Sequence, residues 1–215
     1  MSEPALANQT TGLSNSLGDF AELIAAGTPA PGGGSVAAYC GVLAASLGQM
    51  VCNLTIGKQK YAEAEPRLIE IKAQLEQLSS RMRELIAEDA ASFEAVLRAY
   101  RLPKATDEQK SERGAQIQIA LGGAVAVPFE TAQRGFEVSR LLGELAKIGN
   151  PNALSDVAVG AQLAQAAVRG AAYNVNVNLD SIADRDSADR TREQMKMMSE
   201  QSKTIADEVE AKMKM

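Results

Sequence analysis

The chain has 215 residues, a net charge of -5 and a sequence pI near 5.0, and it contains neither histidine nor tryptophan. The absence of histidine excludes Ser-His-Asp and Cys-His catalysis and any histidine-bound metal, and we predict no metal site. The acidic balance and an aromatic content of 4% argue against nucleic-acid binding, which favours basic patches and stacking rings.

Residues 1–16 are small and polar, and they lack the basic and apolar regions of a signal peptide. We expect this N-terminal segment to be flexible and a single domain to occupy residues 17–215. After residue 16, helix-forming residues dominate, and the alternating patterns of β-strands are essentially absent. The predicted fold class is therefore all-α, a single-domain bundle of long antiparallel helices.

The first two predicted helices flank a loop rich in glycine and proline. A short helix is expected over residues 16–26, and a second over residues 35–56, with Ser35 as its N-cap. Residues 23–57 carry no charge, and this stretch is long enough to span a bilayer. Two prolines and three consecutive glycines interrupt it, and small or polar residues fill its helical part. We therefore interpret it as a buried central helix and predict no membrane association.

The next two predicted helices differ in regularity. A long third helix is expected over residues 64–101. The fourth is expected over residues 106–121, where Gly122, Gly123 and then Pro128 predict a break or kink before the helix resumes.

The last two helices are expected over residues 153–179 and 184–215. The first of them is small and apolar on most faces, which allows helix backbones to approach closely in a bundle core or a subunit interface. The second carries an apolar stripe at helical spacing that includes Met195, Met198, Ile205 and Val209.

Asp89 interrupts the apolar stripe of the third helix. One step beyond Leu85 reaches Asp89, before Phe93, Val96 and Tyr100 resume the stripe. An ionisable group facing a core is costly unless it is paired or functional, and burial raises the pKa of a carboxyl toward the range of general acid–base catalysis. A structural ion pair with a neighbouring helix, or a stripe that drifts to solvent, explains the same pattern.

The glycine loop is a second candidate. Gly32, Gly33, Gly34 and Ser35 lie at a helix start, where backbone N–H groups approach ligands and the helix dipole favours anions. A flexible turn followed by a cap is the simpler interpretation. The Walker pattern is not satisfied, so a nucleoside-triphosphate site is poorly supported.

Four other polar residues have two interpretations each. Lys58 and Lys60 follow the second helix, where they either complement its dipole or bind the carboxylates of an acidic substrate. Asp156 either satisfies the first turn of its helix or borders a cleft. Asn174 lies in an apolar helix end, where backbone hydrogen bonding competes with substrate binding as the explanation.

An ordered series of motifs resembles the cyclodeaminase/cyclohydrolase family of folate enzymes. The resemblance spans about residues 20–179, and Gln59 departs from it at a position where the family often has lysine. The matching strings are Ala30-Pro31-Gly32-Gly33-Gly34-Ser35, Met50-Val51-Cys52-Asn53-Leu54-Thr55-Ile56-Gly57-Lys58-Gln59-Lys60-Tyr61, Glu88-Asp89-Ala90-Ala91-Ser92-Phe93, Ala99-Tyr100-Arg101-Leu102-Pro103-Lys104, Gly149-Asn150 to Ser155-Asp156, and Asn174-Val175-Asn176-Val177-Asn178-Leu179.

The resemblance implies an all-helical homodimer that acts on the one-carbon unit bridging N5 and N10 of tetrahydrofolate. It favours hydrolysis of 5,10-methenyltetrahydrofolate to 10-formyltetrahydrofolate, with no cofactor beyond the folate substrate. Asp89 becomes the leading acid–base or electrostatic group, with Asp156 second. The expected substrate-binding residues are Gly32, Gly33, Gly34, Ser35, Asn53, Lys58, Lys60 and Asn174.

Two alternatives remain at this point. The first is the same fold releasing ammonia from 5-formiminotetrahydrofolate, and the second is a non-catalytic helical scaffold that binds a protein partner. Cys40 and Cys52 are twelve residues apart on one predicted helix and cannot reach each other, so we expect a reducing, cytoplasmic location.

Overall fold

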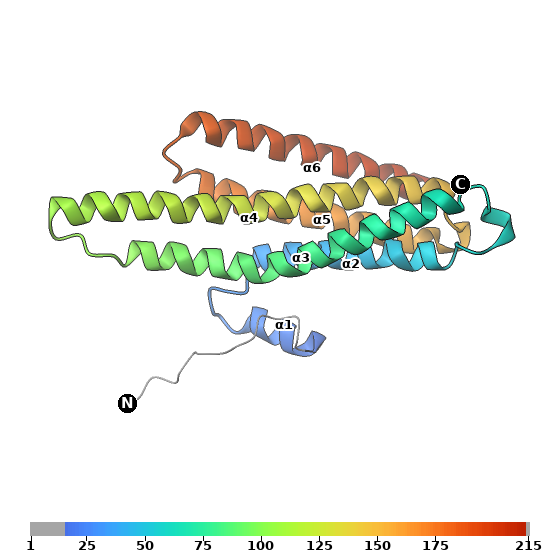
Figure 1. The fold of residues 1–215 in the computed structure, drawn as a ribbon, viewed down its shortest axis with the longest axis horizontal. Helices are drawn as coiled ribbons and strands as arrows, with labels where there is room; N and C mark the ends of the chain where they lie inside the picture. The colour runs from blue at the N-terminus through green and yellow to red at the C-terminus, as the bar shows by residue number, and fades with distance from the viewer. Residues whose placement is uncertain (1–15, 214–215) are drawn as a thin grey trace.

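The computed structural model describes residues 16–213, so the N-terminal segment expected to be flexible lies outside the described residues except for Ser16. Within this range the chain forms only helices, which confirms the all-α prediction. Helices α2 to α6 lie along one long axis, and α1 stands to one side (Figure 1). The elements are α1 (Leu17–Ala25), α2 (Gly33–Asn53), the 3-10 helix η1 (Gln59–Tyr61), α3 (Glu65–Tyr100), α4 (Asp107–Ile148), the 3-10 helix η2 (Pro151–Ala153), α5 (Leu154–Leu179) and α6 (Arg185–Met213).

The start of α2 differs from the prediction. The helix begins at Gly33 with Gly32 as its N-cap, and no side chain caps it. Ser35 is therefore not the N-cap, because its hydroxyl points to α3 and bonds there instead of to the backbone of its own first turn. By contrast, Ser16 caps α1 in a capping box with Asp19, at the predicted boundary.

Helix α2 forms the centre of the bundle and packs against α5, α3 and α4. Among the described residues it is also the one helix long and apolar enough to cross a membrane, with 56% of its apolar window buried inside the bundle. Its neighbours supply fully buried side chains, among them Leu75 of α3 and Leu142 of α4. Burial against these helices accounts for the uncharged sequence of α2.

The stripe on α3 is confirmed as far as Leu85 but not beyond Asp89. Leu85 is fully buried, whereas Phe93 and Tyr100 are 39% and 46% exposed. The reason is visible in Figure 1, where the end of α3 and the start of α4 project as a pair past the other helices. Only one side of each helix is covered there, so the predicted continuation of the core stripe through Phe93 and Tyr100 is wrong.

Of the break or kink predicted near Pro128, the break is wrong, because α4 runs without interruption from Asp107 to Ile148. A proline within a helix leaves the carbonyl four residues earlier without its usual donor. That carbonyl belongs to Ala124, and the side-chain Nδ2 of Asn178 on α5 donates a hydrogen bond to it at 2.8 Å. A neighbouring helix thus satisfies the acceptor and stabilises the continuous helix.

The apolar stripe predicted for the last helix is confirmed. Met195 and Val209 are each 1% exposed, and Met198 and Ile205 are partly buried and pack against the core. Helix α6 thereby covers α4 and α5.

Close packing around α2 gives a stability prediction at Gly48. A Cβ at this position lies 2.7 Å from a Leu75 methyl and 3.0 Å from a Leu142 methyl, and both leucines are fully buried. We expect Gly48→Ala to lower the free energy of unfolding by about 1–3 kcal/mol, because the core must shift to admit a methyl group. Urea denaturation measures this change.

Gly122→Ala is the matched control for that substitution. Gly122 lies inside α4 with nothing within 4 Å of an added Cβ. Alanine is favoured over glycine by about 1 kcal/mol in an exposed helix interior, so this variant should gain stability. A Gly48→Ala variant as stable as Gly122→Ala would contradict the packing described here.

Candidate functional site

The structure divides the predicted site residues between the two ends of α2. One group, here called the aspartate cluster, surrounds the start of α2 and consists of Gly32, Gly33, Gly34, Ser35, Asp89 and Asn174. The other, called the lysine cluster, follows the end of α2 and consists of Asn53, Lys58 and Lys60. Helix α2 has 21 residues, so the clusters are separated by roughly 30 Å at 1.5 Å per residue.

Ser35 and Asp89 make the central contact of the aspartate cluster. The Ser35 hydroxyl donates to Asp89 Oδ2 at 2.9 Å and lies 3.3 Å from the carbonyl oxygen of Ile86, one turn earlier on α3. Ser35 is fully buried, and Asp89 is partly buried. Among residues 16–213 the partner of the Asp89 carboxylate is Ser35, and Asp89 makes no ion pair. The structural ion pair considered from the sequence is therefore absent from the described chain.

Glycine at position 34 lets α2 approach this carboxylate. A Cβ on Gly34 would lie 2.1 Å from Asp89 Oδ1 and 2.6 Å from its Cγ, far inside van der Waals contact. On the other side, a Cβ on Gly33 would lie 3.7 Å from Asn174 Nδ2, which donates to the Gly170 carbonyl at 2.8 Å. Helices α3 and α5 thus place one carboxylate and one carboxamide beside the glycine loop.

The environment of Asp89 changes its acidity. Burial raises the pKa of the Asp89 carboxyl above its ordinary value, and hydrogen bonds from the hydroxyl and backbone N–H of Ser35 lower it in part. A raised pKa makes a carboxylate a better proton acceptor, which suits it to general acid–base catalysis.

At the other end of α2, Lys60 of the lysine cluster borders a hollow of about 310 Å³ between η1, α4 and α5. The Lys60 ammonium lies 5.4 Å from the centre of the Tyr61 ring, and Tyr61 Oη donates to Asn150 Oδ1 at 3.3 Å. The Asn150 backbone N–H in turn donates to the buried Thr55 Oγ1 at 3.1 Å. This chain of contacts fixes the segment after α2 against the α4–α5 junction.

Lys147 joins this hollow, and sequence reasoning did not select it. It lies in the last turn of α4, where the helix dipole alone favours a cation, so the pattern offers no functional signal. Together Lys60 and Lys147 make the wall of the hollow basic. Such a wall suits carboxylates.

The two predicted catalytic carboxylates do not meet within one chain. Asp156 lies in the first turn of α5, immediately after the Asn150 junction, whereas Asn174 lies beside the glycine loop. The 18 residues from Asp156 to Asn174 correspond to roughly 27 Å of helix. Asp156 therefore belongs to the end of the bundle that holds the lysine cluster.

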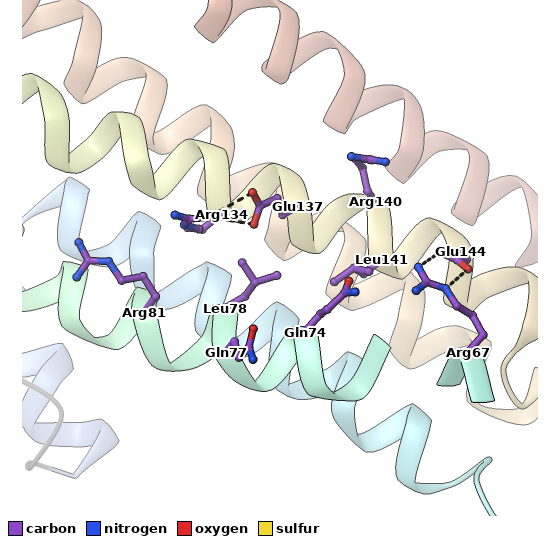
Figure 2. A pocket seen from close by; sticks show the side chains of 10 residues that line it. All are labelled: Arg67, Gln74, Gln77, Leu78, Arg81, Arg134, Glu137, Arg140, Leu141 and Glu144. Carbon is purple, nitrogen blue, oxygen red and sulfur yellow. Dashed lines mark hydrogen bonds and ion pairs between the residues drawn. The ribbon is translucent and has the colours of Figure 1, made fainter. Parts of the chain in front are cut away.

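A separate hollow of about 430 Å³ lies between α3 and α4, and Figure 2 shows its side chains. Its carboxylates are already bound to arginines. Arg67 donates to both oxygens of Glu144 at 2.7 Å and holds the pKa of that carboxyl below its ordinary value, and Arg134 pairs with Glu137 at 3.3 Å. The Arg67–Glu144 pair connects α3 to α4 at one end of the hollow, and Arg81 pairs with Glu130 at 2.8 Å at the other. The aspartate cluster is therefore the stronger candidate site.

Residues 16–197 match the formiminotransferase-cyclodeaminase family model. Over 170 residues, the chain is 44% identical to a methenyltetrahydrofolate cyclohydrolase from Methylorubrum extorquens, covering 79% of this chain and 82% of that protein. It is also 34% identical over 194 residues to the formimidoyltransferase-cyclodeaminase of Rattus norvegicus. That match covers 90% of this chain but 36% of the rat protein.

The fold is similar to that of a solved protein. The crystal structure of a formiminotetrahydrofolate cyclodeaminase from Thermotoga maritima superposes with a TM-score of 0.80 at 29% sequence identity. The match covers 91% of this chain and 95% of that one.

Proposed function

The chain belongs to the formiminotransferase-cyclodeaminase family, and from this membership we propose that it hydrolyses 5,10-methenyltetrahydrofolate to 10-formyltetrahydrofolate. The similarity to the cyclohydrolase from Methylorubrum extorquens carries the choice of reaction, because it is high and covers most of both proteins. The match to the rat cyclodeaminase involves about a third of a longer protein at lower identity.

The chemistry of this reaction suits the aspartate cluster. The bridge carbon of the substrate is cationic, so a water molecule can attack it without a metal-bound hydroxide. Asp89 accepts a proton from that water as the C–O bond forms. It then returns a proton to N5 as the C–N5 bond breaks, and the second proton of the water leaves to solvent. The raised pKa of Asp89 suits this exchange, and its negative charge stabilises the cationic substrate.

A direct assay separates this reaction from cyclodeamination. Purified protein should remove the near-UV absorbance of 5,10-methenyltetrahydrofolate much faster than the uncatalysed reaction. It should release little ammonia from 5-formiminotetrahydrofolate. Ammonia release as the faster reaction would assign the chain to the cyclodeaminases, and no reaction with either folate would favour a scaffold.

We further propose that a second copy of the chain completes the site. The aspartate and lysine clusters are too far apart for the bridge carbon and the glutamate carboxylates of one folate molecule. A two-fold axis near Leu43, the midpoint of α2, brings the lysine cluster of one protomer to the aspartate cluster of the other. Lys58 and Lys60 would then bind the glutamate carboxylates at the partner's Asp89 site.

Exposed apolar side chains support this interface. Leu43 and Met50 of α2 and its C-cap residue Leu54 are 38%, 37% and 43% exposed and recur at helical spacing on one face. On α5, Tyr173 and Val177 are exposed one turn apart. Exposed apolar side chains that recur on one face of a helix suit a subunit contact.

Complementation between two inactive variants tests the shared site. Heterodimers of one Asp89→Asn chain and one Lys58→Glu/Lys60→Glu chain, isolated with two affinity tags, should recover about half of the wild-type activity per dimer, because one of their two sites is intact. Each homodimeric variant alone should stay inactive at low substrate. If Asp89 and the lysines of the same chain form the site, the heterodimer should recover nothing.

We infer that the protein is cytoplasmic and that its reaction needs no cofactor beyond the tetrahydrofolate substrate. Cys40 and Cys52 both lie on α2 as free thiols, as suits a reducing compartment.

A further inference from the structure

We propose that Ser35 is a positioning residue that holds the Asp89 carboxylate in its working orientation. This inference rests on the proposed hydrolysis, because Asp89 is the proton-transfer group of that reaction. Ser35 itself is fully buried, so it does not touch the substrate. Its role therefore differs from the substrate contact expected from the sequence.

The contacts of the hydroxyl fix one carboxylate oxygen. Ser35 Oγ lies 2.9 Å from Asp89 Oδ2 and 3.3 Å from the Ile86 carbonyl oxygen, so its single proton is directed at two acceptors of the same turn of α3. Water does not compete at a fully buried donor. A hydrogen bond to an ionised acceptor is also stronger than one between neutral groups.

The backbone of α2 restrains the other oxygen. Asp89 Oδ1 lies so close to Gly34 that a Cβ there would be 2.1 Å away. The carboxylate is thus held by a donor at Oδ2 and by packing beside Oδ1. This arrangement limits rotation of the carboxylate. Fixed donors and acceptors of this kind lower the reorganisation needed in the transition state.

Ser35→Ala tests the role of the hydroxyl. The variant should fold, because alanine favours the helix and the Ile86 carbonyl is part of α3. We expect kcat to fall about tenfold with KM little changed, because the lost contact acts on the transition state. The pH dependence of kcat should have a midpoint set by Asp89. In Ser35→Ala this midpoint should move to higher pH, because the hydroxyl favours the ionised carboxylate.

Ser46→Ala is the matched control. Ser46 lies on the same helix, is partly buried, and donates to the Val42 carbonyl of its own helix at 2.8 Å. It should keep the wild-type kcat and pH midpoint. If Ser35→Ala keeps the wild-type kcat and midpoint, or loses activity with the midpoint unchanged, Ser35 does not position Asp89.

Carbon-13 NMR separates this inference from the proposed reaction. The Asp89 carboxyl signal, assigned by its loss in Asp89→Asn, titrates without any turnover. A midpoint raised in Ser35→Ala supports the positioning contact even if the wild-type protein hydrolyses no folate. An unchanged NMR midpoint overturns the inference even if the wild-type protein is an active cyclohydrolase.

Discussion

Asp89→Asn is expected to lower kcat for 5,10-methenyltetrahydrofolate by about a hundredfold or more, the effect of removing a general acid–base group. Asparagine has nearly the same shape and can still accept a hydrogen bond from Ser35, so the geometry of the cluster is kept. What is lost is the negative charge and the ability to exchange a proton. Steady-state kinetics at saturating substrate measure the effect.

The same substitution should not destabilise the protein. Because burial raises the pKa of Asp89, the folded protein keeps a proton there at pH values where the unfolded chain has already released it. The free energy of unfolding contributed by this group therefore falls as the pH rises from the ordinary pKa of aspartate to the raised one. At pH 7 the Asn variant should have a Tm equal to or above that of the wild type. Activity lost together with stability would instead indicate a structural role.

Glu88→Gln is the matched control for Asp89→Asn. Glu88 precedes Asp89 on α3, but it points to Arg81, which donates to Glu88 Oε1 at 2.6 Å. Its side chain pairs within α3 with Arg81, which also binds Glu130 of α4, and it is not part of the aspartate cluster. We expect wild-type kcat from this variant. An equal loss of kcat in Glu88→Gln and Asp89→Asn would contradict the role of Asp89 as the proton-transfer group.

Regular helix patterns could be predicted from the sequence, and their exceptions could not. The stripe on α6 and the start of α1 near Ser16 depend on residues close together in the chain. The continuity of α4 through Pro128 depends on Asn178, fifty residues later, which supplies a donor to Ala124. The exposure of Tyr100 depends on how far α3 projects past its neighbours. Both are long-range effects that local propensity does not contain.

Prediction of the candidate site from the sequence has the same limit. The interruption of an apolar stripe identified Asp89, because that signal is periodic and local. The contact between Asp89 and Ser35 joins residues 54 apart in the chain, so it cannot be predicted locally. A serine at a helix start is instead predicted to be an N-cap. Lys60 lies far from Asp89 because α2 is long. Motifs read in chain order contain no distances, so this separation could not be predicted from the sequence.

Gly34→Ala should be nearly as harmful to catalysis as the loss of Asp89 itself. The added Cβ would lie 2.1 Å from Oδ1, 2.6 Å from Cγ and 2.7 Å from Oδ2 of Asp89, so the entire carboxylate must move. Displacement of a catalytic group by about 1 Å costs on the order of a hundredfold in rate. We expect a kcat loss of this size, and little further loss when Gly34→Ala is added to Asp89→Asn, because both act on the same group.

Gly41→Ala separates displacement of Asp89 from general crowding of α2. A Cβ on Gly41 would lie equally close, 2.1 Å from Met82 Sδ, but two turns away from the aspartate cluster. Overpacking at that position should lower the free energy of unfolding by about 1–3 kcal/mol and leave kcat near the wild-type value. Equal kcat losses at Gly34 and Gly41 would show that α2 transmits any distortion to the site. A loss confined to Gly34→Ala ties the rate to the position of the Asp89 carboxylate, since the two substitutions differ in the side chain they displace.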